Sequence, residues 1–337
     1  MSTLQVFVLT LVVSRSLVLS LKIARAFDVL EWTPELIAKD YFEGNVTIVN
    51  GGIPSLFSDP TVDLGSNSET QLLRHYASHR NIRSIVAVVE VHYRIVASKK
   101  AGVNSLEDLR NKRIGAIPST SSEYFVQQYL ATAGLEPADY TVVPGLGCLQ
   151  EPCGSGTLPD MLRKGSIDAI GMWEPSVEIS AQALGSDAIV FESDQTVYRE
   201  IYNIATTTEK LNDPDKRREI ILFLKALKRA DDIFQNKPDS VILRAAEAVK
   251  VNATVLKAAW PVHQWNARVP SDMVDVLVEE DKYVAAYDRR DALTREDVSM
   301  LVDSSVLEEA SFGGQSQVTC SSPTCSPRSL ENIPRGY

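Results

Sequence analysis

The sequence contains few of the residues on which catalysis and metal binding most often depend. Its 337 residues include only four histidines and four cysteines. No GxSxG, Walker A or GxGxxG motif occurs, so the signatures of α/β-hydrolases, P-loop enzymes and dinucleotide-binding enzymes are missing. The cysteines also lack the CxxC spacing of a zinc or redox site. We therefore expect no catalytic residue of a familiar type, no metal and no cofactor.

Positive charge is also in short supply. Lysine and arginine together number 34 against 44 acidic residues, which leaves a net charge of −10. Nucleic acids and anionic membrane surfaces are bound by basic patches, so neither is an expected partner. The chain is longer than one typical domain, and its 44% hydrophobic content is enough to bury a sizeable core. The length therefore predicts two lobes, and we expect a monomer.

The N-terminus is apolar over residues 4–13 and 17–19 but lacks the basic start of a typical signal peptide. This stretch is too short to predict a transmembrane helix, and no stable membrane insertion of the mature chain is expected. Ala24-Arg25-Ala26 resembles a cleavage site, but cutting there would remove the first predicted strand. We therefore expect a signal peptide over residues 1–18.

The cysteines and glycosylation motifs bear on the compartment. Cys148 and Cys153 are close enough in sequence to form a small-loop disulfide in a secreted chain, and Asn45 and Asn252 begin N-x-T triplets. We expect a secreted or extracytoplasmic protein, with a cytoplasmic location as the alternative. Residues 311–337 are rich in Ser, Pro and Gly, and we expect a disordered tail there.

Strand and helix signals alternate through the first two thirds of the chain. Strands are predicted at 21–27, 46–49, 62–65, 85–91, 93–97, 113–117, 140–143, 167–172 and 188–191. Helices are predicted at 33–42, 68–79, 104–109, 123–133, 158–164 and 174–185, and again at 213–234, 240–249, 253–260, 271–286 and 295–303. Repeated strand–helix units indicate an α/β fold with mostly parallel sheets flanked by helices.

Four segments of this pattern resemble a known superfamily. They are SLEDLRNKRIG at 105–115, Ser119-Thr120-Ser121, LPDMLRKGSIDA at 158–169, and Trp173-Glu174-Pro175. In this order they resemble the second lobe of the nitrate/sulfonate/taurine-binding proteins of bacterial transporters and of the related thiamine-pyrimidine-synthase-like proteins. The resemblance implies a two-lobed, type II periplasmic-binding-protein-like fold. Lobe one would comprise residues 19–104 and 205–310, including the C-terminal helices, and lobe two residues 105–204, joined by two crossing strands.

The resemblance also implies a ligand held between the lobes by loops after strands and by helix N-termini. The ligand-binding candidates are Glu31, Trp32, Ser66, Asn67, Ser68, Glu90, His92, Ser119, Thr120, Ser121, Trp173 and Glu174. Each has a structural alternative. The hydroxyl side chains are also typical helix caps, the tryptophans typical core residues, and the glutamates typical of solvated helix starts.

The polarity of the candidates indicates the kind of ligand. Glu31, Glu69, Glu90 and Glu174 fall near predicted cleft edges, whereas no Arg or Lys lies in a matching loop. A sulfonate or nitrate would require basic groups or many donors. We therefore predict a ligand with an amine or amino-heterocycle, such as a thiamine-precursor pyrimidine.

The alternative functions are a pathway enzyme or enzyme accessory acting on a pyrimidine-like metabolite, and an adaptor whose cleft is filled by its own side chains. The related synthases carry a His after the first strand and a cysteine-dense motif. Here residues 28–34 contain no His, and no cysteine cluster follows the second lobe. Glu90 and His92 are the remaining candidates for an acid–base pair.

Overall fold

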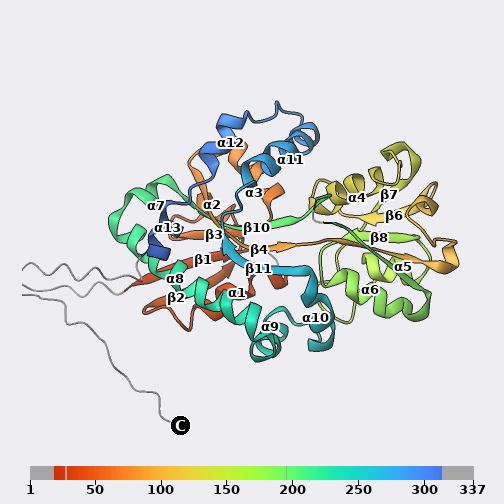
Figure 1. The fold of residues 1–337 in the computed structure, drawn as a ribbon, viewed down its shortest axis with the longest axis horizontal. Helices are drawn as coiled ribbons and strands as arrows, with labels where there is room; N and C mark the ends of the chain where they lie inside the picture. Colours follow the sequence, from red (N-terminus) through yellow and green to blue (C-terminus); the bar gives the residue numbers. More distant parts are fainter. Residues whose placement is uncertain (1–18, 27–28, 195, 313–337) are drawn as a thin grey trace, which may run out of the picture.

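The chain folds into two lobes, each built on its own β-sheet (Figure 1). The computed structural model describes residues 19–26, 29–194 and 196–312. The first sheet has the order β11-β4-β10-β3-β1-β2. Its strands are β1 (Ser20–Arg25), β2 (Asn45–Asn50), β3 (Leu64–Asn67), β4 (Ile82–Val91), β10 (Glu200–Thr207) and β11 (His263–Arg268). This sheet forms the first lobe.

The second sheet has the order β7-β6-β8-β5-β9 and forms the second lobe. Its strands are β5 (Arg94–Ser98), β6 (Arg113–Ala116), β7 (Thr141–Pro144), β8 (Ala169–Met172) and β9 (Ala188–Glu192). The α/β, two-lobed prediction is confirmed, but the sheets are mixed rather than mostly parallel. β10 runs antiparallel to β3 and β4, and β5 runs antiparallel to β8 and β9. β10 and β5 each follow directly on a crossing between the lobes, and β11 also runs antiparallel to β4.

Helices cover both faces of each sheet. In the first lobe they are α1 (Thr33–Ala38), α2 (Ser55–Ser58), α3 (Glu69–Ser78), α7 (Thr208–Asn212), α8 (Pro214–Asn236), α9 (Ile242–Val249), α10 (Ala253–Ala259), α11 (Met273–Asp288), α12 (Arg295–Leu301) and α13 (Ser305–Phe312). In the second lobe they are α4 (Ser121–Ala131), α5 (Leu158–Arg163) and α6 (Ser176–Leu184). Helices α3, α11 and α12 pack on one face of the first sheet and α1 and α8 on the other (Figure 1).

The long helix α8 shows why these segments fold as they do. Asp213 caps its start by accepting hydrogen bonds from the backbone N–H groups of Asp215 and Lys216, and Pro214 occupies the first turn. Apolar residues recur at helical spacing along this segment, and those that face the core, such as Phe223 and Leu227, are fully buried. Burial of one such side chain stabilises the fold by about 1.5–3 kcal/mol. The sequence pattern therefore locates both the helix and its buried face.

The lobes are connected by two crossings. One is the short link between β4 and β5, which contains His92 and Tyr93, and the other runs from the end of β9 at Glu192 to the start of β10 at Glu200. The second lobe therefore begins at β5, not at residue 105, and ends before β10. The sequence predicts separate strands at 85–91 and 93–97 but carries no signal that they belong to different sheets.

Some expectations concern segments outside the described residues. The predicted signal peptide over 1–18 and the predicted tail from 313 on both lie there. Residues 311 and 312, placed in the predicted tail, instead end helix α13. β11 was not predicted, and its residues fall between the helices predicted at 253–260 and 271–286. Among the described helices, none is both long and apolar enough to span a membrane.

Candidate functional site

Four glutamates meet at one edge of the first sheet, and we call them the acidic cluster: Glu31, Glu69, Glu200 and Glu280. Glu31 follows β1 in a 3-10 turn (Leu30–Trp32), and Glu69 begins α3 directly after β3. Glu200 begins β10, which runs antiparallel to β3, so its start lies beside the end of β3. Glu280 comes from α11. All four are at most 5% exposed.

Three members of the acidic cluster each bury one carboxyl oxygen that has no hydrogen-bond partner in the described part of the chain. Glu69 is satisfied, because its Oε1 accepts from the Tyr198 hydroxyl at 2.8 Å and its Oε2 from the Ile201 N–H at 2.8 Å. In contrast, the Oε2 atoms of Glu31, Glu200 and Glu280 are buried and have no hydrogen-bond partner among the described residues. A buried polar atom left without a partner is costly, so these oxygens are available to a donor from outside the chain.

Burial makes these carboxyls weak acids. It raises the pKa of Glu31 to about 8, and the nearby Glu174 carboxylate of the second lobe adds to the rise. Burial raises the pKa of Glu69 to about 7, although the hydrogen bond from Tyr198 opposes it. The pKa values of Glu200 and Glu280 are raised well above normal by burial and by the neighbouring glutamates. At neutral pH the cluster therefore holds protons that a bound cation would displace.

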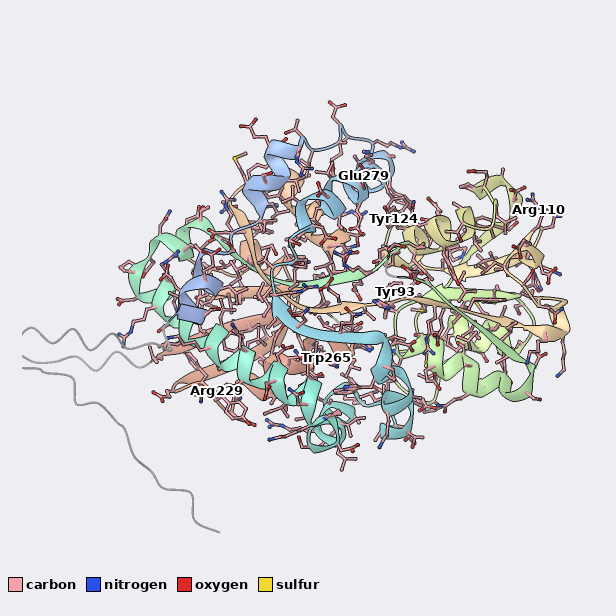
Figure 2. The ribbon with its side chains drawn as sticks, in the orientation of Figure 1. Tyr93, Arg110, Tyr124, Arg229, Trp265 and Glu279 are labelled. Atoms are coloured by element: carbon pink, nitrogen blue, oxygen red, sulfur yellow. A yellow bond between two sulfur atoms is a disulfide. The ribbon has the colours of Figure 1, made fainter. Side chains whose placement is uncertain are left out.

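Tyrosines of the two crossings pack against the acidic cluster. Tyr93 and Tyr198 lie edge-to-face with ring centroids 5.1 Å apart, and both rings are buried. Tyr93 lies between the lobes in Figure 2. Its hydroxyl is 3.2 Å from Oγ of Ser121, the first residue of α4. The hinge, the acidic cluster and a helix N-terminus of the second lobe are thus in direct contact.

Two tryptophans predicted for the site have buried indole N–H groups. Trp32 Nε1 and Trp173 Nε1 each lack a hydrogen-bond partner in the described part of the chain. The Arg25 guanidinium lies 4.2 Å from the centroid of the Trp32 ring, a cation–π contact. Glu35, on the next helix, is fully buried, and burial raises its pKa to about 8.

The second lobe largely neutralises its own glutamate. Glu174 follows β8, and its Oε1 accepts from Arg94 Nη2 at 2.5 Å and from Arg94 Nε at 3.0 Å. Its Oε2 accepts from the Glu178 N–H at 3.0 Å. Burial nevertheless raises its pKa. This carboxylate has less capacity for a ligand than those of the acidic cluster.

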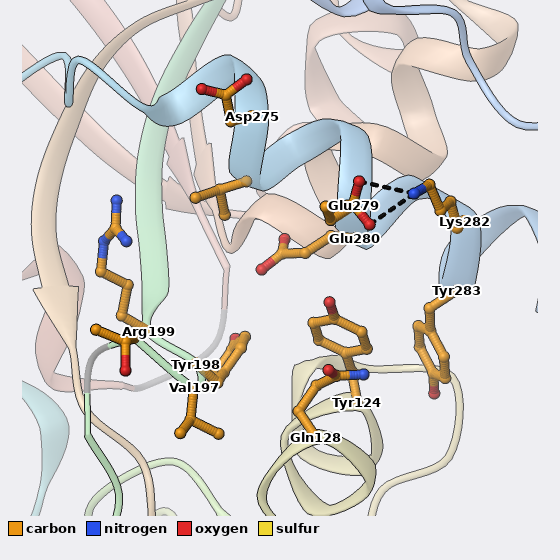
Figure 3. A pocket seen from close by; sticks show the side chains of 12 residues that line it. Tyr124, Gln128, Val197, Tyr198, Arg199, Asp275, Glu279, Glu280, Lys282 and Tyr283 are labelled. Carbon is orange, nitrogen blue, oxygen red and sulfur yellow. Dashed lines mark hydrogen bonds and ion pairs between the residues drawn. The ribbon is translucent and has the colours of Figure 1, made fainter. Parts of the chain in front are cut away.

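A cavity of about 530 Å³ opens between α4 and α11, beside the acidic cluster (Figure 3). We call it the interlobe pocket. Its walls include Tyr124 of α4, Tyr198 and Arg199 of the second crossing, and Glu280 and Tyr283 of α11. Because the first lobe supplies α11 and the second supplies α4, the pocket exists only while the lobes are together.

Glu90 and His92, which were predicted to bind the ligand, contact other side chains of the first lobe and of the second crossing. Arg199 and Arg268 hold both oxygens of Glu90, at 2.5 Å and 2.6 Å, and His92 Nε2 is 3.2 Å from the Gln264 amide. Burial lowers the pKa of His92. The Glu90 carboxylate therefore supports the junction of β4, β10 and β11.

The predicted hydroxyl and amide residues are mostly bound within the chain. Ser66 lies 3.3 Å from the Tyr202 hydroxyl, Asn67 accepts from the Ser68 N–H, and the Ser68 hydroxyl lies 3.3 Å from that of Thr70. Thr120 caps α4. Ser119 has a left-handed backbone, with φ of 65°, and accepts two hydrogen bonds from Arg74 of the first lobe. The capping alternative therefore holds for Thr120, whereas Ser66, Ser68 and Ser119 contact other side chains and form no side-chain cap.

Sequence reasoning missed Glu200, Glu280, Tyr93, Tyr124 and Tyr198 as site residues. Glu200 begins a strand, Glu280 and Tyr124 lie within helices, and Tyr93 and Tyr198 lie in the crossings. The sequence pattern of each segment indicates secondary structure and gives no sign of a site. Glu280 stands in the charged run Glu279-Glu280-Asp281-Lys282, which is typical of a solvated helix face, so the sequence gives no signal of its burial. The described residues contain no group of three or more His, Cys, Asp or Glu side chains arranged to hold a metal ion. The predicted Cys148–Cys153 disulfide is present.

Two sheets connected by two crossings, with a buried polar site between them, define a two-lobed periplasmic-binding-protein-like protein. The family model described as NMT1/THI5 like matches residues 39–241, and the chain belongs to this family. No curated protein matches the sequence.

Solved structures share the fold. The periplasmic aliphatic sulphonate binding protein SsuA from Escherichia coli has a TM-score of 0.66 at 14% identity, over 94% of this chain and 97% of that one. The desulfurization enzyme DSZB has a TM-score of 0.61 at 12% identity, over 86% and 98%. A Candida albicans gene product with the generic periplasmic binding protein fold has a TM-score of 0.56 at 16% identity, over 85% and 96%. At these identities the likeness extends to the fold alone.

Proposed function

We propose that this protein binds a small organic ligand by closing its two lobes, and that the ligand carries an amine or an amino-heteroaromatic ring. A pyrimidine of the kind found in thiamine precursors is one such ligand. The observation that carries the proposal is the acidic cluster, in which Glu31, Glu200 and Glu280 each bury an oxygen with no partner in the described chain.

The charge of the site supports a cationic or hydrogen-bond-donating ligand. A protonated amine or an amino group on a ring supplies N–H donors for the unpartnered oxygens, and its positive charge compensates the carboxylates. SsuA is described as a sulphonate-binding protein. A sulfonate in this site would add negative charge next to the carboxyl groups. Two arginines near the cleft, Arg94 and Arg199, are bound to Glu174 and Glu90.

An extracytoplasmic location is part of the proposal. The Cys148–Cys153 disulfide supports it, because disulfides persist mainly in oxidising compartments. In such a location the protein would act as a scavenger or sensor of its ligand. Hinge closure would bury the ligand and remove water from its polar contacts.

Enzymatic activity is the alternative, and the fold accommodates it, since DSZB is described as a desulfurization enzyme. The acid–base pair considered from the sequence, Glu90 and His92, gives it little support. Both Glu90 oxygens are bound by arginines, and His92 contacts Gln264. A group engaged in this way is poorly placed to accept a proton from a substrate.

The test is a thermal-shift screen of the full chain against thiamine precursors, amines, sulfonates and amino-heterocycles, followed by mass analysis of the compounds. At 100 times its dissociation constant, a ligand that binds only the folded state adds about 2.7 kcal/mol of stability. The proposal predicts that amines or amino-heterocycles raise the midpoint and are recovered unchanged. Stabilisation by sulfonates alone would contradict it, and chemical conversion of the compound would favour an enzyme.

Two variants make the screen specific to the acidic cluster. Glu31→Gln and Glu200→Gln keep the shape of each side chain, but an amide cannot ionise when a cation binds, so both should abolish the shift. Glu43→Gln is the matched control, because Glu43 is exposed in the loop before β2. If all three variants retain the full shift, the acidic cluster is not the binding site.

A further inference from the structure

We propose that the interlobe pocket binds an alkylated ammonium group, with Tyr124, Tyr198 and Tyr283 as its aromatic wall and Glu280 as its counter-ion. The inference rests on the proposed function and narrows it from amines in general to cations whose nitrogen carries methyl or other alkyl groups. The inference places the charged end of the ligand between α4 and α11.

Three tyrosine rings from three different segments form the wall. Tyr124 of α4 is at the centre, with its ring centroid 5.7 Å from that of Tyr198 and 5.1 Å from that of Tyr283. The interplanar angles are 81° and 41°, so the rings form a bent surface and not a flat stack. Figure 3 shows all three rings on the same side of the pocket. Aromatic faces attract organic cations through their quadrupoles, most strongly where water is excluded.

Glu280 lies opposite this wall and supplies the negative charge once a bound cation displaces its proton. Its side chain lines the pocket, and in Figure 3 its carboxyl group points toward Tyr124 and Tyr198. The residue is only 2% exposed, and its Oε2 has no hydrogen-bond partner within the described ranges. A buried carboxylate aimed into a cavity is stabilised by a cation placed there.

The other charged side chains around the pocket are paired. Arg199 bridges Glu90 and Asp272, Lys282 bridges Glu279, and Asp275 bridges Arg295. Glu280 forms no such bridge with another described residue. The local charge of the pocket is therefore dominated by Glu280, and this favours a cation.

The hydroxyl groups explain why the nitrogen should be alkylated. The Tyr198 hydroxyl donates to Glu69, and the Tyr283 hydroxyl donates to Glu123. A primary ammonium has three N–H donors to satisfy, whereas an alkylated one presents mainly methyl surface to the rings and needs only the charge of Glu280. The pocket provides aromatic surface and one carboxyl oxygen without a partner, and these features match an alkylated ammonium.

The test is isothermal titration of the full chain with choline, with ethanolamine and with 3,3-dimethylbutan-1-ol, a neutral compound of the same shape as choline. We expect choline to bind at least about tenfold more tightly than either comparison compound. Equal binding of the neutral alcohol would overturn the role of charge, and tighter binding of ethanolamine would overturn the preference for alkylated nitrogen.

Variants assign the binding to the pocket. Glu280→Gln and Tyr124→Leu should each weaken choline binding by about tenfold or more. Glu296→Gln, at an exposed position on α12, is the matched control and should leave it unchanged. Thermal unfolding of each variant verifies that it is folded, and Tyr124→Leu tests the pocket even if Glu280→Gln does not fold. Unchanged choline binding in a folded variant at either position would overturn the inference.

The two proposals fail separately. If choline does not bind but an aminopyrimidine does, and its binding depends on Glu31, the interlobe pocket is not an alkylammonium site while the proposed function stands. If no amine or amino-heterocycle of either kind binds, both are wrong.

Discussion

The hydroxyl of Tyr283, on α11 of the first lobe, donates a 2.7 Å hydrogen bond to Oε2 of Glu123, on α4 of the second lobe. The same oxygen accepts from the Ser119 N–H at 2.9 Å. Burial and the hydrogen bond to Glu123 raise the pKa of Tyr283, so the hydroxyl remains protonated and able to donate. This bond can form only when the lobes are together, so the structure represents the closed arrangement.

Arg74 forms a second connection between the lobes, and its removal should favour opening. Its guanidinium donates to the Ser119 carbonyl at 3.0 Å and to the Ser119 hydroxyl at 2.8 Å. Hydrogen bonds from a charged donor contribute about 1.5–3 kcal/mol. Arg74→Ala should therefore increase the radius of gyration of the ligand-free protein in small-angle scattering and weaken ligand binding by about tenfold or more.

The control for this prediction is Lys257→Ala, which removes an exposed ion pair with Asp239 within the first lobe. Such exposed pairs contribute little. Its scattering should match that of the unaltered protein. If Arg74→Ala also leaves scattering and affinity unchanged, the contact with Ser119 does not hold the lobes together.

The buried carboxyls predict an unusual dependence of stability on pH. Glu31 has an ordinary pKa of 4.5 when unfolded and about 8 when folded, so the folded chain holds a proton that the unfolded chain has lost. The stability associated with this proton is complete below the unfolded pKa and is lost as the pH rises through the folded value. The free energy of unfolding of the ligand-free protein should thus fall as the pH rises from about 4.5 to about 8, by up to about 1.4 kcal/mol per pH unit for one carboxyl, and should level off above pH 8.

Urea unfolding at several pH values measures this slope. The window from about pH 7 to about pH 8 avoids the buried His263, whose pKa is lowered to about 4 by burial and which makes stability rise with pH at lower values. Glu31→Gln should reduce the slope by the contribution of one carboxyl, because the amide cannot release a proton, while Glu35, whose pKa burial also raises to about 8, still contributes. If the free energy of unfolding of the unaltered protein does not change with pH in this window, the buried carboxyls have lost their protons at lower pH or are in contact with water.

Reduction of the disulfide should cost moderate stability. Cys148 and Cys153 close a small loop, with a sequence separation of 5, and a loop of this size stabilises the folded state by about 2 kcal/mol in the chain-entropy treatment. Denaturant unfolding with and without reductant measures the difference, and a Cys148→Ser/Cys153→Ser variant should behave like the reduced protein. Mass analysis after thiol alkylation verifies that the reductant has opened the disulfide. If the disulfide is opened but the stability does not change, the loop is held by its other contacts, such as those of Ser176 with the Cys148 backbone.

The sequence predicts the elements that follow simple periodic rules. α8 is marked by Asp213, Pro214 and a repeating apolar face, and α4 by its capping hydroxyls and by Gly134 after its end. The two-lobed arrangement follows from the resemblance of residues 105–175, because consecutive strand–helix units there match a known order. Local spacing is sufficient for these features since each depends on neighbouring residues.

The site was predicted less completely, because it is built by contacts between distant residues. Glu31 was recognised at the end of a strand, but Glu200 and Glu280 become part of the same cluster only after β10 and α11 have packed beside it. Likewise, nothing in the sequence around Glu90 shows that Arg199 and Arg268 will bind both of its oxygens. A pattern of residue types identifies candidates, whereas their partners depend on the tertiary fold.

The most direct test of a cationic ligand is to count the protons exchanged on binding. Titration calorimetry of choline and of 4-amino-5-hydroxymethyl-2-methylpyrimidine at pH 7, in two buffers with different ionisation enthalpies, gives this number. Because the pKa of Glu31 is about 8, a bound cation should displace protons from the acidic cluster. The account predicts that at least one of the two compounds binds with net release of protons to the buffer. Binding without proton release, or no binding of either compound, would contradict it.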